Sequence, residues 1–120
     1  ATELEAEIIE SADTLEHNLG VKVDHFAYTF GNLASFSSAA LAVARRRFQF
    51  VYTGMRGDNA HGVPCWALRR DAVAPANAFE LVGSLLEGGA DRRYARDLAL
   101  FESWGMQGRT PLSKEVTCLP

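Results

Sequence analysis

Phe-Glu-Ser-Trp-Gly, at residues 101–105, closes the last segment of the chain that has regular hydrophobic patterning. We predict a short strand here, from residue 100 to about residue 106. With the segments before it, this strand completes the order strand, helix, strand, strand, helix, strand. Two right-handed β-α-β connections joined by a hairpin build a ferredoxin-like α+β sandwich with the strand order four-one-three-two. In that two-layer arrangement, helices cover one face of the sheet and leave the other face free.

Alternating side chains predict the first strand over residues 21–30. Phe26 and Tyr28 point to one face of this strand, and His25 points to the other. Because the first strand is central in the predicted sheet, we expect its aromatic side chains in the core. His25 then lies on the face that no helix covers.

The second and third strands are predicted over residues 48–53 and 63–70. A polar, glycine-rich loop separates them, so we expect an antiparallel hairpin. The predicted core combines the apolar residues of the strands with those of the helices. It contains Phe26, Tyr28, Phe36, Phe50, Trp66, Leu68, Val82 and Leu86.

Helical spacing of apolar residues predicts three helical regions. The first covers residues 3–19, carries mostly acidic charges and ends at a glycine, a common C-cap residue. The second follows Asn32 as its N-cap and ends at about Arg46. The third follows Asn77. It should be kinked or split at residues 88–89, because two glycines inside a helix cost about 2 kcal/mol.

The length of 120 residues and the 48% hydrophobic content predict one domain with a real core. We expect three parts within it. These are an acidic N-terminal helix at residues 1–20, a ferredoxin-like core at residues 21–106 and a C-terminal extension at residues 107–120.

Several features of the sequence point to the cytoplasm. No apolar run approaches the roughly 20 residues that span a bilayer, so we expect no membrane contact. The acidic start lacks the basic and apolar regions of a signal peptide. Two cysteines, Cys65 and Cys118, are too few for a disulfide framework. We therefore expect a cytoplasmic protein in which Cys65 is a free, buried side chain.

Residues 46–51, Arg-Arg-Phe-Gln-Phe-Val, partly match the RNA-recognition signature in which strand aromatics stack on bases. However, arginine and glutamine replace the two small residues of that signature, and the match falls on the second strand rather than the central third. We therefore interpret Phe48, Phe50 and Tyr52 as core aromatics. The net charge of −3 also disfavours direct binding of nucleic acid.

The sequence offers no local signature of catalysis. It has no glycine-rich phosphate loop, no metal-like cysteine pair and no nucleophile elbow. Its three histidines, His17, His25 and His61, are far apart along the chain. We expect no catalytic residue, no metal and no cofactor, and we regard His25 as a binding residue on the open sheet face.

The order of the elements and the closing Phe-Glu-Ser-Trp-Gly resemble the family called regulator of ribonuclease E activity B. That family typically ends its last helix in a strand reading aromatic-Asp-Gly-Trp. Phe101, Glu102 and Trp104 match in kind, whereas Ser103 replaces the glycine, and the similarity covers roughly residues 4–106. The resemblance implies a ferredoxin-like adaptor without a catalytic site that binds a ribonuclease E-like scaffold and modulates RNA turnover.

These observations predict a non-enzymatic, protein-binding regulator. We expect its protein partner to contact Glu102 and Trp104 on the terminal edge strand, because an edge strand offers unpaired backbone groups, or to contact the acidic N-terminal helix. The open sheet face around His25 is the next candidate surface. The alternative is a small-molecule-binding or catalytic domain of the same fold, in which a dimer forms a cavity. The sequence leaves open whether the protein is a monomer or a dimer.

Overall fold

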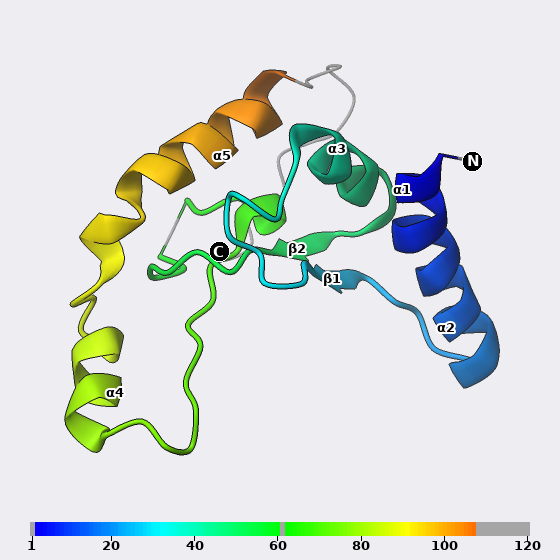
Figure 1. Cartoon of the computed structure of the whole chain (residues 1–120). Helices are drawn as coiled ribbons and strands as arrows, with labels where there is room; N and C mark the ends of the chain where they lie inside the picture. Colours follow the sequence, from blue (N-terminus) through cyan, green and yellow to red (C-terminus); the bar gives the residue numbers. More distant parts are fainter. Residues whose placement is uncertain (1, 61, 108–120) are drawn as a thin grey trace.

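The structure is a computed structural model that describes residues 2–60 and 62–107 (Figure 1). Most of the predicted C-terminal extension, Cys118 and His61 lie outside the described residues. Within the described part of the chain, helices predominate and a small two-stranded sheet lies among them. The molecule is therefore an α+β protein. None of its described helices combines the length and the apolar character needed to cross a membrane.

The N-terminal helix is confirmed with the predicted bounds. It consists of α1 (Glu3–Glu5), a π-helical segment (Ala6–Glu10) and α2 (Ser11–Leu19), which follow one another without interruption. The side chain of Thr2 accepts a hydrogen bond from the backbone N–H of Glu5 and caps the start. Gly20 ends the helix with a φ of 66°, a left-handed conformation that glycine adopts without a steric penalty.

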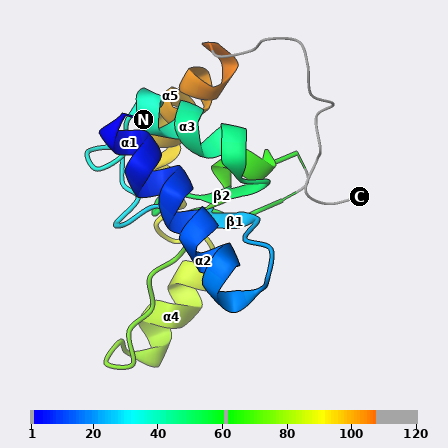
Figure 2. The same cartoon turned by 90° about the vertical axis from the view of Figure 1, so that its right-hand side faces the viewer.

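Two strands form the sheet, and they run parallel to each other. β1 (His25–Ala27) pairs with β2 (Phe50–Tyr52), so that His25 lies beside Phe50 and Ala27 beside Tyr52. Between them in the sequence, α3 (Ser38–Arg47) packs on one face of the sheet, as Figures 1 and 2 show. The unit is thus strand, helix, strand, with one face of the sheet covered.

The predicted third strand is wrong over most of its length. Residues Cys65–Ala67 form one turn of 3-10 helix, and Leu68 bridges to Tyr52 in the parallel sense. The predicted antiparallel hairpin with the second strand is therefore wrong as well. Pro64 precedes the turn and has no N–H to donate to a strand ladder.

The predicted strand at 100–106 is also wrong, because these residues belong to α5 (Ala95–Gln107). Leu98, Phe101 and Gly105 are buried and recur at helical spacing, so they place one side of the helix against the core. A ferredoxin-like sheet is not confirmed. Within residues 2–60 and 62–107, β1 pairs directly with β2 instead of being separated from it by a third strand.

The second and third helical regions are confirmed, but some of their bounds differ from the predicted ones. α3 begins after Ser37, whose hydroxyl accepts the N–H of Ala40 at 3.1 Å, and not after Asn32. α4 (Phe79–Leu86) ends before the two glycines, a 3-10 turn (Asp91–Arg93) follows, and then α5 begins. The predicted split at residues 88–89 is confirmed.

The core lies between α3, α5, the N-terminal helix and the covered face of the sheet. Of the predicted core residues, Phe36 and Leu68 are buried and Leu86 is 80% exposed. The others are half-buried; they are Phe26, Tyr28, Phe50, Trp66 and Val82. The largest fully buried side chains include Phe101, Leu41, Met55 and Val51, none of which was among the predicted core residues. Leu86 is exposed because α4 extends away from the body of the protein (Figure 1).

Candidate functional site

The uncovered face of the sheet is built by alternate residues of the two strands. Val51 is fully buried against the core, so its neighbours on β2, Phe50 and Tyr52, point the opposite way. The parallel register places His25 of β1 on the same side as Phe50. The prediction that His25 lies on the open face is confirmed. The prediction that Phe50 and Tyr52 are core aromatics is wrong, because Val51 is the residue of β2 that faces α3.

Three rings on this surface are ordered by mutual contacts, and we call them the aromatic face: His25, Phe50 and Tyr52. The imidazole of His25 stacks on the ring of Phe50, with 4.5 Å between centroids and 17° between planes. It also stacks on Tyr52 at 5.8 Å and 19°. His25 Nδ1 and the Tyr52 hydroxyl share a hydrogen bond of 2.9 Å. His25 itself remains exposed, so the stack presents an aromatic surface to solvent.

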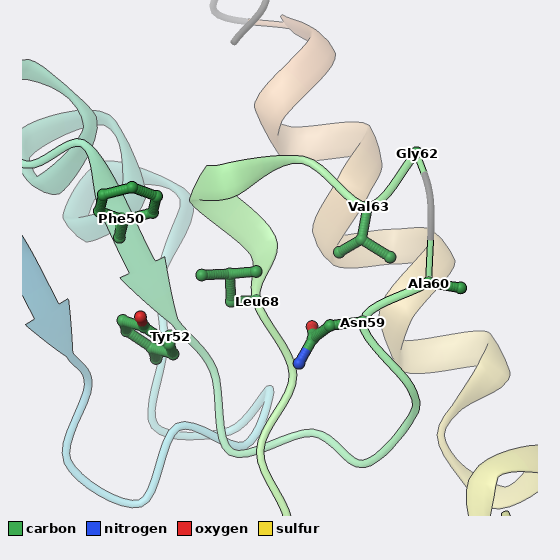
Figure 3. A pocket seen from close by; sticks show the side chains of 7 residues that line it. All are labelled: Phe50, Tyr52, Asn59, Ala60, Gly62, Val63 and Leu68. Carbon is green, nitrogen blue, oxygen red and sulfur yellow. The ribbon is translucent and has the colours of Figure 1, made fainter. Parts of the chain in front are cut away.

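A hollow of about 290 Å³ adjoins the aromatic face (Figure 3). Its walls come from β2, from Leu68 and from the loop that precedes the 3-10 turn. The residues that line it are Phe50, Tyr52, Asn59, Ala60, Gly62, Val63 and Leu68. Its walls are therefore mainly apolar, and two rings of the aromatic face form one side.

Asn59 is the polar side chain of the hollow, and its amide is already engaged. It accepts a hydrogen bond from the backbone N–H of Arg69 at 2.8 Å and donates one to the backbone carbonyl of Arg69 at 3.0 Å. This pair of bonds positions the loop next to Leu68. The amide of Asn59 thus forms its hydrogen bonds within the wall of the hollow. A ligand in the hollow would make mostly apolar contacts.

Glu102 and Trp104, the other predicted binding residues, lie on α5 and not on a strand edge. Glu102 pairs with Arg69 at 3.5 Å, and Trp104 is half-buried against Phe101, with 5.9 Å between ring centroids. The edge-strand argument for these two residues is wrong because a helix has no free strand edge. Figure 1 shows α5 and β1 in different parts of the molecule, so His25 is not brought together with them.

The rest of the closing motif also packs α5 against the body of the protein. The guanidinium of Arg45 donates to the backbone carbonyl of Gly105 at 2.6 Å. The same guanidinium lies over the ring of Trp66, 4.5 Å from its centroid. Phe101 is fully buried. Residues 101–105, which suggested a functional motif, therefore serve to pack α5 against the rest of the protein.

The groups whose pKa is shifted lie elsewhere, between the N-terminal helix and α3. The pKa of Glu5 falls to about 2, chiefly because the backbone N–H of Thr2 donates to it and then because Arg46 does. The pKa of Glu16 is lowered by the backbone N–H of Val23 and by Arg47. These ion pairs link two helices and are not next to the aromatic face. Among the described residues there is also no group of side chains suited to hold a metal ion.

Cys65 corrects an expectation from the sequence. It is buried, but it is disulfide-bonded and not a free thiol. The sequence has one other cysteine, Cys118, which lies outside the described residues. Two cysteines are too few for a disulfide framework, but they are enough for one disulfide, and that count was the available signal. Disulfides persist mainly in oxidising compartments, so the cytoplasmic location stays a prediction.

No family model matches the chain, and no curated protein matches it either. The resemblance to the regulator of ribonuclease E activity B family therefore stays a prediction.

Proposed function

We propose that this chain is a non-enzymatic, protein-binding regulator and that the aromatic face with its adjoining hollow is its contact surface. The observation that carries the proposal is the exposed stack of His25 on Phe50 and Tyr52, on the side of the sheet that α3 does not cover. Aromatic side chains are enriched at protein interfaces, where they serve as large and rigid anchors. A stack beside an apolar hollow suits the insertion of one apolar side chain of a partner.

The size and chemistry of the hollow support binding more than catalysis. Sites for small molecules usually measure about 300–1,000 Å³ and contain several convergent polar groups. This hollow measures about 290 Å³, and the amide of Asn59 is engaged with the backbone of Arg69. The mainly apolar walls suit an apolar side chain of a protein partner.

A pull-down from an extract, analysed by mass spectrometry, tests this proposal. Tyr52→Ser removes one ring from the aromatic face, and Leu86→Ser removes a large, exposed apolar side chain from α4, on a different surface. We expect a partner that the wild type and Leu86→Ser both retain and that Tyr52→Ser loses, while circular dichroism shows all three folded. Equal capture by the three proteins would contradict the proposal.

The resemblance proposes a particular partner, a ribonuclease E-like scaffold. Biolayer interferometry with a purified scaffold region of that kind tests it directly. Binding that Tyr52→Ser weakens at least tenfold supports the assignment to this surface; we base the magnitude on the 2 kcal/mol or so that interface aromatics commonly contribute. Absence of binding rejects this partner. The pull-down then still tests whether the aromatic face binds another protein.

The hollow favours a second candidate, the binding of a small planar molecule. Phe50 and Tyr52 form one wall, and such a molecule could stack on them. Amide chemical shifts measured during titration with an aromatic fragment mixture distinguish this alternative. Saturable shifts around Val63 and Leu68 would favour it, whereas a flat response would reject it.

A further inference from the structure

The outer edge of β1 is an unpaired strand edge. In a parallel ladder, alternate residues of a strand bond to the neighbouring strand. Phe50 donates its N–H to the carbonyl of Asp24 at 3.0 Å, and Tyr28 donates to the carbonyl of Tyr52 at 3.1 Å. Residues 24, 26 and 28 therefore face β2. The backbone groups of His25 and Ala27 point the other way, and they have no partner in the part of the chain that the structure describes.

The far edge of β2, in contrast, is occupied. Leu68 donates its N–H to the carbonyl of Val51 at 3.0 Å, and Thr53 donates to the carbonyl of Leu68 at 2.8 Å. The free edge of the sheet is thus β1, and both of its outward residues are exposed. An exposed edge of this kind pairs with another strand.

Large apolar side chains are exposed at both ends of this edge. Val21 precedes β1 and is 55% exposed, whereas Phe30 follows it and is 82% exposed. The backbone of Phe30 has a φ of 59°, a left-handed conformation that is unfavourable for a bulky side chain. A partner that covers the edge would bury both of these side chains.

We propose that the β1 edge is the interface of a symmetric dimer, in which β1 pairs antiparallel with β1 of a second copy. Closed dimers with a two-fold axis are the commonest protein assemblies, and their interfaces use the same surface on both copies. A two-fold axis at Phe26 sets His25 opposite Ala27 of the second copy, and Ala27 opposite His25 of the second copy. This register uses every outward N–H and carbonyl of His25 and Ala27, and it places a large side chain next to a small one.

The same register accounts for the exposed apolar ends. Antiparallel pairing brings the end of one strand to the start of the other, so Phe30 meets the segment around Val21 of the second copy. The open faces of the two sheets then join into one four-stranded surface. His25, Phe50 and Tyr52 of both copies lie on it, so the aromatic face of one chain is half of the complete surface. The dimer follows from the strand edge alone and does not rest on the proposed function.

The first test measures the mass of the purified protein by light scattering after size exclusion, from low micromolar to near-millimolar concentration. We expect the mass to rise from 13.1 kDa toward twice that value. Ala27→Pro removes an N–H that makes no bond to residues 2–60 or 62–107, so the monomer keeps its sheet while the dimer loses two hydrogen bonds. At about 1 kcal/mol for each bond, the dissociation constant should rise at least tenfold.

Ala27→Val is the matched control, because it retains the N–H and should still dimerise. Phe30→Ser is a second variant that leaves the ladder intact, and it should weaken the dimer severalfold with an unchanged circular dichroism spectrum. A wild-type mass that stays at 13.1 kDa throughout would overturn the proposal. A dimer that both Ala27→Pro and Phe30→Ser leave equally stable would also overturn it, because association would then use another surface. Tyr52→Ser should not change the mass, so the dimer and the proposed binding function can fail independently.

Discussion

Gly105 lies against the ring of Trp66 at the point where α5 approaches the body of the protein most closely. A Cβ built on Gly105 would overlap the six-membered ring of Trp66. The carbonyl of Gly105 also accepts the hydrogen bond from Arg45, which stacks on that ring. The absence of a side chain at residue 105 is therefore what lets α5 approach this closely.

We expect Gly105→Ala to destabilise the protein by about 1–3 kcal/mol, the usual cost of overpacking a core. Urea unfolding followed by tryptophan fluorescence measures the change. Gly83→Ala is the control, because Gly83 lies in α4 with open space around it. Alanine there should be neutral or stabilise the protein by up to about 1 kcal/mol through helix propensity. Equal effects at both positions would show that the contact with Trp66 is unimportant.

Cys65 gives a second prediction at this scale. Because it is disulfide-bonded, it should resist a maleimide in denaturant without reductant and react after reduction. Peptide mapping by mass spectrometry locates the label. Denaturation removes the protection that burial alone would give, so labelling of Cys65 before reduction would show a free thiol.

Single residues also show where sequence reasoning succeeds and where it fails. The open position of His25 could be predicted from alternation within one strand. The outward position of Phe50 and Tyr52 could not be predicted from the sequence. Only the tertiary packing shows that Val51 is the residue of β2 that faces α3. Of the three residues of the aromatic face, His25 alone was therefore placed correctly from the sequence.

At the scale of elements, ion pairs link the N-terminal helix to α3. Glu5 pairs with Arg46, while Arg47 contacts Asp13 at 3.0 Å and Glu16 at 2.9 Å. The arginines in the last turn of α3 suit the negative end of its dipole. They also neutralise the acidic face of the neighbouring helix, which explains why an acidic helix packs here.

Because of these ion pairs, we expect the stability of the fold to decrease at acidic pH. The pKa of Glu5 falls from 4.5 to about 2 on folding, so its carboxylate stabilises the fold at pH values above 4.5. That contribution should be lost as the pH falls from 4.5 toward 2, and Glu16, whose pKa is also lowered, should add to it. We expect the melting temperature to fall over this range, and less steeply in Glu5→Gln.

Glu3→Gln is the control for this titration, because Glu3 forms no ion pair with the described residues. Its melting temperature should follow that of the wild type at each pH. Added salt should reduce the effect, since exposed ion pairs are screened. Identical slopes for wild type and Glu5→Gln would contradict the role of Glu5.

The elements divide clearly into those that local sequence determines and those that it does not. The helix at residues 3–19 follows from apolar spacing and its terminal glycine, and apolar spacing also predicts the helix that ends at residue 47, although its cap is Ser37 and not Asn32. In the last segment, residues 101–105 show no clear alternation, whereas Leu98, Phe101 and Gly105 recur at helical spacing and are buried in α5. Parallel pairing of β1 with β2 is a long-range contact that neither strand encodes alone.

At the scale of the whole molecule, α4 and the segments that flank it extend away from the rest of the protein. Phe79 is 84% exposed and Leu86 is 80% exposed, so most of the apolar surface of α4 makes no internal contact. Figure 1 shows α4 apart from the sheet and α3. α5, in contrast, returns to the core and buries Leu98 and Phe101. The stability of the molecule should therefore depend on α5 and little on residues 72–93, since Tyr94 already packs against the core.

Limited proteolysis tests this division. Arg92 and Arg93 are exposed between α4 and α5, and segments with few buried contacts open locally at low free-energy cost. Trypsin should cut there first, and earlier than at Arg47, which pairs with Asp13 and Glu16. Because α5 packs through Phe101, the two fragments should elute together in size exclusion under reducing conditions and separate only on a denaturing gel. Fragments that separate in native buffer would show that the connection through α4, and not the packing of α5, keeps the molecule together.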